Sequence, residues 1–321
     1  MKKYKVILTG KTWPEAFEKL KKYCDIKVWE EDTSIPRKIL FDWLKDAEGL
    51  FSTNDINIDD TLLSHAPKLQ VIAQSSVGYD NIDIESCNNR NILVGNTPGV
   101  LVDSTANLTF GLLLSSARRI HEGWDYVKKG GWEKDGVNKI YGTELKEKTL
   151  GIVGMGSIGS EVAKRAQAFG MNVIYHNRNQ RSDEAELKVK YKSLNKLLED
   201  SDFVISLIPL TDSSKKFFGY NQFLKMKPTA YFINASRGGV VDKKGLYRAL
   251  KEEEIMYAAL DVTDPEPINK DDPLLGLSNI LITPHIGSAT VETRNKMANM
   301  SVDNLLAGLK GETMPACINF Q

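Results

Sequence analysis

One glycine-rich run constrains the fold of this chain more than any other feature. Gly154-Met155-Gly156-Ser157-Ile158-Gly159 follows a strand-like segment, TLGIVG at 149–154, and opens a helix-like one, SIGSEVAKRAQAFG at 157–170. In such a turn the first glycine permits a tight reversal, the second lets the backbone approach a pyrophosphate, and the third lets the helix pack closely on the strand. The helix start also offers unpaired N–H groups to phosphate. The context predicts a dinucleotide-binding loop, with a plain strand-to-helix turn as the alternative.

Strand-like and helix-like segments alternate on both sides of this loop. We expect strands before it at 5–9, 26–30, 49–53, 69–76 and 92–96, and helices at 14–23 and 35–47. From the loop onward we expect strands at 149–154, 172–177, 203–209, 230–236, 257–262 and 279–284. Such alternation favours parallel sheets with helices on both faces. At roughly 150 residues per domain, a chain of 321 residues is expected to form two domains. We therefore predict an α/β protein with two doubly wound parallel-sheet domains.

Two long helical segments set the expected domain boundaries. Residues 103–130 are predicted to form one helix, with Asp103 or Ser104 as its N-cap. A last helix is expected from about Val291 to Leu309, and the strand-like tail at 315–320 is expected to return to the first domain. The prediction is a discontinuous first domain, 1–101 with 291–321, and a second domain at 102–290.

The composition argues against several classes of function. Lys plus Arg and Asp plus Glu both number 42, so no basic excess is available for a nucleic-acid partner. The three cysteines lack metal-ligand spacing and are typical of free thiols in a reducing compartment. No apolar run reaches the ~18 residues of a membrane span, and the start MKKYKVILTG has no signal-peptide apolar region. We expect a cytoplasmic protein without a membrane partner or a metal.

The segment 172-NVIYHNRNQR-181 ends the strand where many dinucleotide-binding domains carry an acid, roughly 20 residues after the glycine-rich run. Asn177 and Arg178 stand there instead, with Arg181 close behind. A carboxylate would bind ribose hydroxyls and repel a 2′-phosphate, whereas a guanidinium can bind phosphate through two hydrogen bonds. We therefore expect NADP(H) to be preferred over NAD(H), with Arg178 as the main contact, Asn177 as a neutral contact and Arg181 as a helper. The alternative, that Arg178 is a solvated loop charge and NAD(H) is used, stays open.

Three potentially catalytic side chains each follow a different strand of the second series. They are Arg237 in INASRGG, Glu266 in DVTDPEP and His285 in TPHIGSAT. The carboxyl ends of strands in a doubly wound sheet form its ligand-binding edge. A carboxylate beside an imidazole stabilises the protonated form, which can donate a proton to a carbonyl oxygen. A guanidinium can hold a 2-oxo acid and stabilise negative charge as hydride arrives. Structural ion pairing of Glu266 and a surface position for Arg237 are the alternatives.

These motifs give the chain a resemblance, over nearly its whole length, to the D-isomer-specific 2-hydroxyacid dehydrogenase family. The segments that carry it are SVGYDNID at 76–83, GIVGMGSIG at 151–159, SLIPLT at 206–211, INASRGG at 233–239, LDVTDPEP at 260–267 and TPHIGSAT at 283–290. The resemblance implies a flavodoxin-like substrate domain, a Rossmann cofactor domain and an active site in the cleft between them. It also implies that the family's catalytic Arg, Glu and His correspond to Arg237, Glu266 and His285.

The resemblance implies further site residues as well. Backbone N–H groups of Ser76, Val77 and Gly78 would bind the substrate anion, together with Arg237 and His285. The additional cofactor contacts that it implies are Thr105, Pro209, Ala235, Ser236, Asp261 and Gly287. Family members are typically homodimers, and the segment from Trp124 to about Leu145 is the expected dimer arm.

Within the family, DVTDPEP, HIGSATVETRNKM and NLLAGLKGE are most similar to the glyoxylate/hydroxypyruvate reductase branch. That likeness implies an NADPH-preferring reductase of small 2-oxo acids that forms D-2-hydroxy acids. Two alternatives stay open. One is a dehydrogenase for another acid, such as 2-ketogluconate or a branched-chain 2-oxo acid. The other is a regulatory protein that senses nicotinamide cofactors without catalysis.

Overall fold

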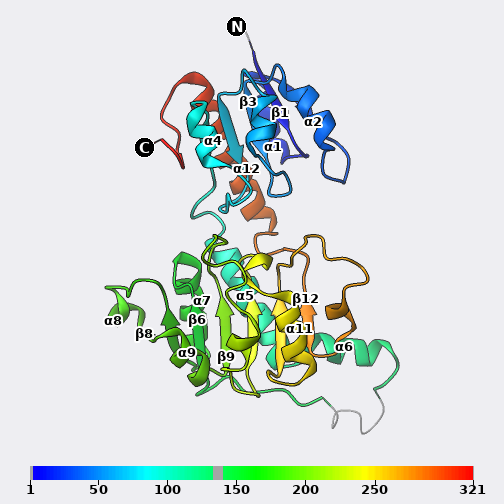
Figure 1. Cartoon of the computed structure of the whole chain (residues 1–321), viewed down its shortest axis with the longest axis vertical. Coiled ribbons are helices and arrows are strands. Elements are labelled where there is room, and N and C mark those ends of the chain that lie inside the picture. Colours follow the sequence, from blue (N-terminus) through cyan, green and yellow to red (C-terminus); the bar gives the residue numbers. More distant parts are fainter. Residues whose placement is uncertain (1–2, 133–139, 321) are drawn as a thin grey trace. The chain divides into compact units, whose positions relative to one another are not determined.

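The computed structural model describes residues 3–132 and 140–320 (Figure 1). The chain separates into two compact units, one formed by Met1–Leu101 with Ala289–Gln321 and the other by Val102–Ser288. The expected dimer arm lies partly outside the described residues, because these omit 133–139. The assignment of the two units to substrate and cofactor stays a prediction.

Unit 1 contains a five-stranded parallel sheet in the flavodoxin-like order β2-β1-β3-β4-β5. Its strands are β1 (Tyr4–Leu8), β2 (Cys24–Val28), β3 (Gly49–Ser52), β4 (Val71–Gln74) and β5 (Leu93–Gly95). Its helices are α1 (Pro14–Lys21), α2 (Arg37–Leu44), α3 (Asp60–Ser64), α4 (Ile84–Asn89) and α12 (Val291–Lys310). All residues of β3 and β4 are buried, as expected for a parallel sheet covered on both faces.

Alternate residues of the unit 1 strands supply two separate cores. Leu50 and Ile72 belong to one core, whereas Phe51 and Val71 belong to the other, which also contains Leu305 of α12. The long helix α12 contacts β3, β4 and β5 and lies beside α1 (Figure 1). Helix α12, from the C-terminal part of the chain, therefore packs on a sheet that is formed by the N-terminal part.

Unit 2 contains a seven-stranded parallel sheet in the order β12-β11-β10-β9-β6-β7-β8. Its strands are β6 (Thr149–Val153), β7 (Asn172–His176), β8 (Lys190–Tyr191), β9 (Phe203–Ser206), β10 (Tyr231–Asn234), β11 (Tyr257–Leu260) and β12 (Ile280–Ile282). Its helices are α5 (Val102–Ala117), α6 (Ile120–Lys128), α7 (Ser157–Ala168), α8 (Glu184–Leu187), α9 (Leu194–Asp200), α10 (Tyr220–Phe223) and α11 (Lys243–Lys251), with 3-10 turns η2 (Gly238–Val240) and η3 (Pro273–Gly276). The strand order reverses at β6, which pairs with both β7 and β9, so the glycine-rich run lies at the switch point of a Rossmann sheet. The short edge strand β8 was not predicted.

The prediction of one helix at 103–130 is wrong, because the helix breaks between Ala117 and Ile120. Arg119 has φ 53°, in the left-handed region, and separates α5 from α6. The physical cause is the returning chain: Thr143 N–H donates to Ala117 O at 2.7 Å, in place of the helical donor. A Cβ on Gly142 would lie 2.4 Å from the same oxygen. The N-cap prediction is wrong too, since Asp103 and Ser104 lie inside α5, which begins at Val102.

The predicted strand at 315–320 is also not formed. A single antiparallel bridge joins Cys317 to Gly95, and Ile318 N–H donates to Val94 O at 2.7 Å. The side chain of Asn319 takes the next positions along β5, accepting from Val94 N at 2.9 Å and donating to Ile92 O at 2.8 Å. At this edge of the unit 1 sheet, the side chain of Asn319 therefore replaces part of the backbone ladder.

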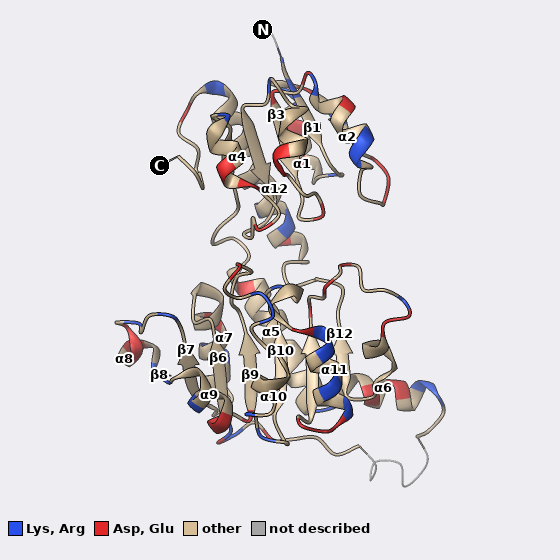
Figure 2. Cartoon of the chain, viewed as in Figure 1, with Lys and Arg blue, Asp and Glu red and all other residues tan. Residues whose placement is uncertain are grey.

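Basic and acidic residues are both spread over the described parts of the two units (Figure 2). None of the described helices has the length and apolarity needed to cross a bilayer. In the same residues, Cys24, Cys87 and Cys317 are all free thiols. Burial raises the pKa of the Cys24 thiol to about 11 and that of Cys87 to about 12.

Candidate active site

The three glycines of the run differ in what surrounds them. Gly154 has φ +102°, and a Cβ there would lie 2.7 Å from the carbonyl of Leu207. A Cβ on Gly159 would lie 2.8 Å from Gly154 O, so the helix start packs directly on the turn. Gly156 has open space where a Cβ would stand, and no side chain caps α7, which begins at Ser157. The middle glycine and the first N–H groups of a twelve-residue helix are thus open toward a phosphate.

The turn after β7 is tied to this run through its side chains. Asn177 accepts a hydrogen bond from Met155 N–H at 2.7 Å and donates one to Met155 O at 3.2 Å. Arg181 donates to the same carbonyl at 2.9 Å and binds both carboxylate oxygens of Asp183, at 2.7 and 2.5 Å. Asn177 and Arg181 therefore hold the glycine-rich run in place.

Arg178 behaves differently from its two neighbours. Its side chain is exposed, and no hydrogen bond or ion pair joins it to any residue that the structure describes. Of the three side chains expected at the 2′-position of the ribose, only Arg178 has no bonds within the described chain. A phosphate could bind its guanidinium without displacing an existing partner.

The four histidines of the chain occupy very different surroundings. His65 stacks on Phe41 with ring centroids 4.0 Å apart, and His121 lies 3.1 Å from Tyr257 OH through Nε2. His176 pairs through Nδ1 with Lys192 O at 3.0 Å. His285 is the histidine paired with a carboxylate, Glu266. Among the described residues, no group of three or more His, Cys, Asp or Glu side chains could hold a metal ion.

His285 and Glu266 form a hydrogen-bonded pair, with Nδ1 of the imidazole 2.8 Å from Oε2 of the carboxylate. The other carboxylate oxygen, Oε1, accepts from Thr263 N–H at 2.9 Å. Burial alone would raise the pKa of Glu266. The hydrogen bond and charge of His285, the Thr263 N–H and the charge of Arg237 outweigh it, so the pKa is lowered overall. Glu266 is therefore an ionised acceptor, and Nε2 is the imidazole nitrogen left for a ligand.

Asp261 supports the loop that carries His285. Its side chain is 2% exposed, and its Oδ1 accepts from Thr283 Oγ1 at 2.7 Å and Ile286 N–H at 2.9 Å. Its Oδ2 accepts from Gly287 N–H at 2.8 Å. These bonds hold His285 at φ +53°, a backbone conformation that costs about 1–3 kcal/mol for a residue other than glycine.

Thr105 and Gly287 lie next to this carboxylate. A Cβ on Gly287 would lie 3.1 Å from Asp261 Oδ2 and 3.4 Å from Thr105 Cγ2. Thr105 and Asp261 are both buried. The structure therefore groups three of the predicted cofactor contacts, Thr105, Asp261 and Gly287, beneath the histidine loop.

Arg237 follows β10 and precedes the 3-10 turn η2. Asn234 orients this segment, because its Nδ2 donates to Arg237 O at 2.9 Å and its Oδ1 accepts from Ser236 N–H at 3.1 Å. A Cβ on Gly238 would lie 1.9 Å from Thr263 O, so only glycine lets this loop lie directly on the loop of Glu266. The strand ends of β10, β11 and β12, which are neighbours in the sheet, thus bring Arg237, Glu266 and His285 to one edge.

The segments after β9 and β10 place the remaining predicted cofactor contacts. Ser236 Oγ lies 3.4 Å from Ser206 Oγ, and Ala235 N–H donates to Ser206 O at 3.4 Å. Pro209 O accepts from Ser214 Oγ at 2.6 Å, in the segment that packs against Gly154 through Leu207. These residues therefore belong to the same edge of the unit 2 sheet.

In unit 1, the loop after β4 contains Ser76, Val77 and Gly78, and the carbonyl oxygens of all three accept hydrogen bonds. Ser76 O accepts from Thr97 N–H at 2.9 Å, Val77 O from the side chain of Asn96 at 2.8 Å, and Gly78 O from Ser76 Oγ at 2.5 Å. The N–H groups of Ser76, Val77 and Gly78 have no acceptor among the residues described. These N–H groups are therefore available as donors to an anion.

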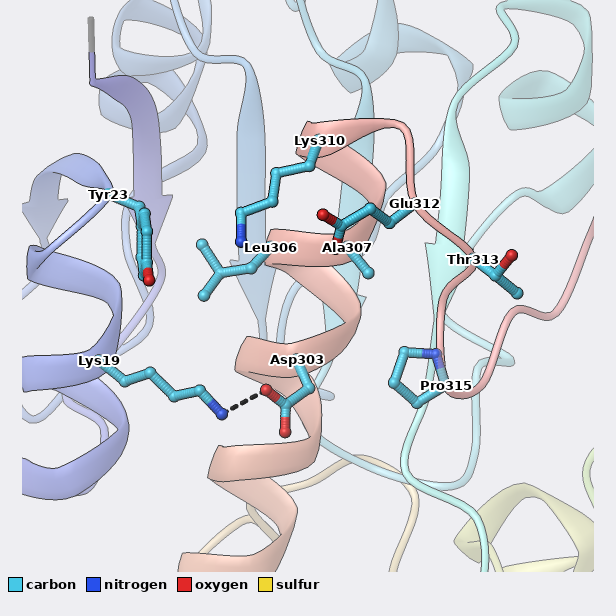
Figure 3. Close-up of a pocket in the computed structure, with 9 residues that line it drawn as sticks. All are labelled: Lys19, Tyr23, Asp303, Leu306, Ala307, Lys310, Glu312, Thr313 and Pro315. Carbon is cyan, nitrogen blue, oxygen red and sulfur yellow. Dashed lines mark hydrogen bonds and ion pairs between the residues drawn. The ribbon is translucent and has the colours of Figure 1, made fainter. Parts of the chain in front are cut away.

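A cavity of about 330 Å³ in unit 1 lies elsewhere (Figure 3). Lys19 and Asp303 form an ion pair across it, and Lys310 Nζ lies 4.5 Å from the centre of the Tyr23 ring. Lys310 ends α12 beside the residues that contact Gly49, the first residue of β3. The cavity is thus at the amino edge of the sheet, opposite the loop after β4.

Comparison with known proteins identifies the family. Residues 110–287 match the family model described as "D-isomer specific 2-hydroxyacid dehydrogenase, NAD binding domain". A glyoxylate reductase of Korarchaeum cryptofilum is 43% identical over 319 residues, 99% of this chain and 96% of the relative. The chain belongs to the D-isomer-specific 2-hydroxyacid dehydrogenase family. This enzyme therefore has a nicotinamide-binding domain, and the predicted α/β fold is confirmed.

Two solved structures that are similar to this chain contain different forms of the cofactor. An NADPH-dependent glyoxylate/hydroxypyruvate reductase from Sinorhizobium meliloti, in complex with NADP and malonate, is 30% identical with a TM-score of 0.89, covering 99% of this chain and 97% of that one. A D-lactate dehydrogenase from Aquifex aeolicus, in complex with NAD and lactic acid, is also 30% identical, with a TM-score of 0.87 and 99% of each chain covered.

Proposed function

We propose that this enzyme reduces small 2-oxo acids, with glyoxylate and hydroxypyruvate as substrates, to D-2-hydroxy acids (glyoxylate gives achiral glycolate), and that it prefers NADPH. The observation that supports it most is the 2.8 Å pair of His285 and Glu266 beside the loop of Arg237, at the edge of a Rossmann sheet. Relatives named glyoxylate reductase support the substrate class. The glycine-rich run fits the cofactor, because Gly156 and the start of α7 are open to a phosphate.

Arg237, Glu266 and His285, here called the triad, have different roles in this proposal. Protonated His285 donates from Nε2 to the carbonyl oxygen, and Glu266 stabilises the positive charge through Nδ1. Arg237 binds the substrate and stabilises the charge that develops on its oxygen. Bound NADPH supplies the hydride that adds to the carbonyl carbon. Hydride and proton together convert C=O to CH–OH, so the reaction balances without another reactant.

The substrate carboxylate is assigned to the loop after β4. Its three unoccupied N–H groups, on Ser76, Val77 and Gly78, are donors of the kind that bind an anion. A short acid offers the carboxylate and the carbonyl on adjacent carbons. A 2-oxo acid therefore carries a carboxylate that this loop can bind, which an aldehyde or a ketone lacks.

The preference for NADPH rests on Arg178. It is the cation of the turn after β7 that is exposed and has no bonds within the described chain. The relative from Sinorhizobium meliloti is named NADPH-dependent, whereas the one from Aquifex aeolicus binds NAD. Both cofactors therefore occur on this fold, and the exposed guanidinium of Arg178 supports NADPH for this chain.

A second copy of the chain is the proposed protein partner. Ile120, Trp124 and Val127 are spaced along one face of α6 and are 58%, 64% and 42% exposed. None of the residues of α6 is buried. An exposed apolar stripe of this kind marks an interaction surface, and it lies at the start of the expected dimer arm.

Initial rates of NADPH and NADH oxidation test the proposal. The panel contains glyoxylate, hydroxypyruvate, 2-ketogluconate and a branched-chain 2-oxo acid. We expect glyoxylate and hydroxypyruvate to have the highest kcat/KM, with NADPH above NADH. A higher kcat/KM for one of the other two acids would show that this acid, and not glyoxylate or hydroxypyruvate, is the preferred substrate. Tight cofactor binding without turnover of any acid would favour the nicotinamide-sensing alternative.

A further inference from the structure

A chain of three hydrogen bonds runs behind the loop after β4. Asn304, on α12, is fully buried, and its Oδ1 accepts from Ala316 N–H at 2.9 Å. Its Nδ2 donates to Asn96 O at 2.8 Å. The side chain of Asn96 in turn donates to Val77 O at 2.8 Å. This amide relay, Asn304–Asn96–Val77, connects the C-terminal helix to the loop assigned to the substrate carboxylate.

The relay depends on a close approach at the end of β5. A Cβ on Gly95 would lie 2.9 Å from Cβ and Cγ of Asn304 and 2.6 Å from Cε of Met314. Real Cβ atoms do not tolerate such distances, because buried side chains are already packed at high density. Glycine at position 95 therefore allows Asn304 to lie across the strand end and to reach Asn96.

The planar geometry of the peptide bond means that this relay also sets the direction of the N–H groups in the loop. The C=O of Val77 and the N–H of Gly78 belong to one planar trans peptide, so they point in opposite directions. Holding Val77 O on Asn96 therefore aims Gly78 N–H to the opposite side. In the same way, Thr97 N–H holds Ser76 O and aims the N–H of Val77. Of these two donors, Asn96 acts through its side chain and Thr97 through its backbone. A substitution can therefore remove the bond from Asn96 but not the one from Thr97.

We infer that Asn96 is a positioning residue for the carboxylate of the substrate, fixed in turn by Asn304. This rests on the proposed function, because it assigns the carboxylate to the loop of Ser76, Val77 and Gly78. Without the Asn96 amide, the peptide between Val77 and Gly78 is free to rotate. The Gly78 N–H must then be oriented each time the substrate carboxylate binds, and this costs binding free energy. The cofactor loop and the triad do not use this relay, so carboxylate binding is the step that weakens.

Asn96→Ala and Asn96→Asp test the relay by steady-state kinetics with glyoxylate. The first removes the donor, and the second replaces it with an acceptor of the same shape. A hydrogen bond to a charged group is strong enough that misdirecting one donor should raise KM for glyoxylate about 10- to 100-fold. The expected changes in kcat and in the KM of the cofactor are less than about threefold, because neither depends on this peptide. Unchanged KM for glyoxylate in both variants would overturn the inference.

Asn299→Asp is the matched control. Asn299 also lies on α12, donates to Asn295 O at 3.1 Å and belongs to the same unit, but it does not touch the relay. We expect wild-type kinetics from it. An equal rise in KM with Asn299→Asp would contradict the inference, because it would show a general effect of charge on unit 1. If Asn96→Ala unfolds in a thermal melt, Asn96→Ser keeps a small polar side chain at this half-buried position and serves in its place.

A binding measurement separates this inference from the proposed reaction. Glyoxylate is titrated into the ¹⁵N-glycine-labelled enzyme saturated with NADP⁺, where no hydride is available, and the Gly78 N–H resonance is followed. We expect a shift in wild type, with Kd about 10- to 100-fold weaker in Asn96→Ala. If wild type shifts but reduces no acid in the panel, the proposed function fails and the relay stands. If wild type reduces glyoxylate while Asn96→Ala binds it equally well, the relay fails and the function stands.

Discussion

Nδ1 of His285 lies 2.8 Å from Oε2 of Glu266, and this distance assigns the two nitrogens of the imidazole. Because the pKa of Glu266 is lowered overall, its carboxylate is an acceptor, and Nδ1 must be the donor. Nε2 is then the atom that can exchange a proton with substrate. Asp261 holds the loop that carries His285 through three hydrogen bonds of its carboxylate.

Replacement of His285 by alanine should remove the proton donor. General acid catalysis contributes about 10²–10⁴-fold to rate, so kcat should fall by that factor. Binding of the cofactor, measured by fluorescence titration, should change less than about twofold, since the side chain is not part of the glycine-rich run. His65→Ala, which removes a histidine stacked on Phe41, is the control and should keep full activity. Wild-type turnover in His285→Ala would refute the assigned role.

Glu266→Gln should keep the shape of the pair and remove its charge. A carboxylate stabilises a protonated imidazole beside it, whereas an amide does not. The rate of reduction should therefore fall, because the positive charge on the proton donor is no longer stabilised. The measurement is kcat/KM for glyoxylate, with wild type and variant compared under the same conditions. An unchanged kcat/KM would show that Glu266 acts only in packing.

The same variant should change how stability depends on pH. The pKa of Glu266 is lowered in the folded protein, so its contribution to the free energy of unfolding is fully present above its unfolded-state pKa, about 4.3. That contribution is lost as pH falls through the folded-state pKa. The stability difference between wild type and Glu266→Gln should therefore narrow on acidification below about pH 4.3. Thermal unfolding from pH 7 to pH 3 measures it, and a difference that widens would contradict the pKa direction.

Arg178→Asp should reverse the choice of cofactor. The substitution removes the guanidinium expected at the 2′-phosphate and supplies a carboxylate suited to ribose hydroxyls. We expect kcat/KM for NADPH to fall by at least about tenfold, while that for NADH holds or rises. Lys225→Asp, the same charge change elsewhere on the surface of unit 2, is the control. A ratio of the two cofactors that does not change would mean that Arg178 is only a solvated charge.

Trp124→Ser should weaken association of two copies. Large aromatic side chains dominate the energetics of interfaces, and Trp124 is 64% exposed at the centre of the α6 stripe. Sedimentation velocity should show a dimer for wild type and a shift toward monomer for the variant. Leu224→Ser removes an apolar side chain that is 47% exposed in the same unit and should leave the dimer intact. A monomeric wild type would rule out the proposed interface.

The sequence was sufficient to predict the fold class and the family, for a physical reason. Parallel strands buried on both faces appear as short apolar runs, and the glycine-rich run has few uses other than a strand-to-helix turn of this kind. Arg237, Glu266 and His285 could be expected on one edge, because residues that follow parallel strands must lie at the same end of the sheet. These features could be predicted because each depends on a short stretch of sequence.

Contacts between distant segments were the ones that the sequence did not reveal. The helix at 103–130 breaks because Thr143 and Gly142 return to Ala117 O, more than twenty residues away in the chain. Asn177 was expected to make a neutral contact with the cofactor, and the sequence did not reveal that both ends of its amide are bonded to Met155. The relay from Asn304 to Asn96 joins the last helix to an early strand end. In each case a polar group, whether of the backbone or of a side chain, has several plausible partners, and only the fold selects one.

Direct transfer of hydride is the central claim, and isotope transfer tests it most directly. The enzyme is supplied with glyoxylate and with NADPH that carries deuterium at C4 of the nicotinamide, on one face and then on the other. We expect one of the two labelled cofactors to give glycolate that contains one deuterium per molecule, detected by mass spectrometry, and the other to give unlabelled glycolate. Unlabelled product from both cofactors, or no glycolate at all, would contradict direct transfer of hydride.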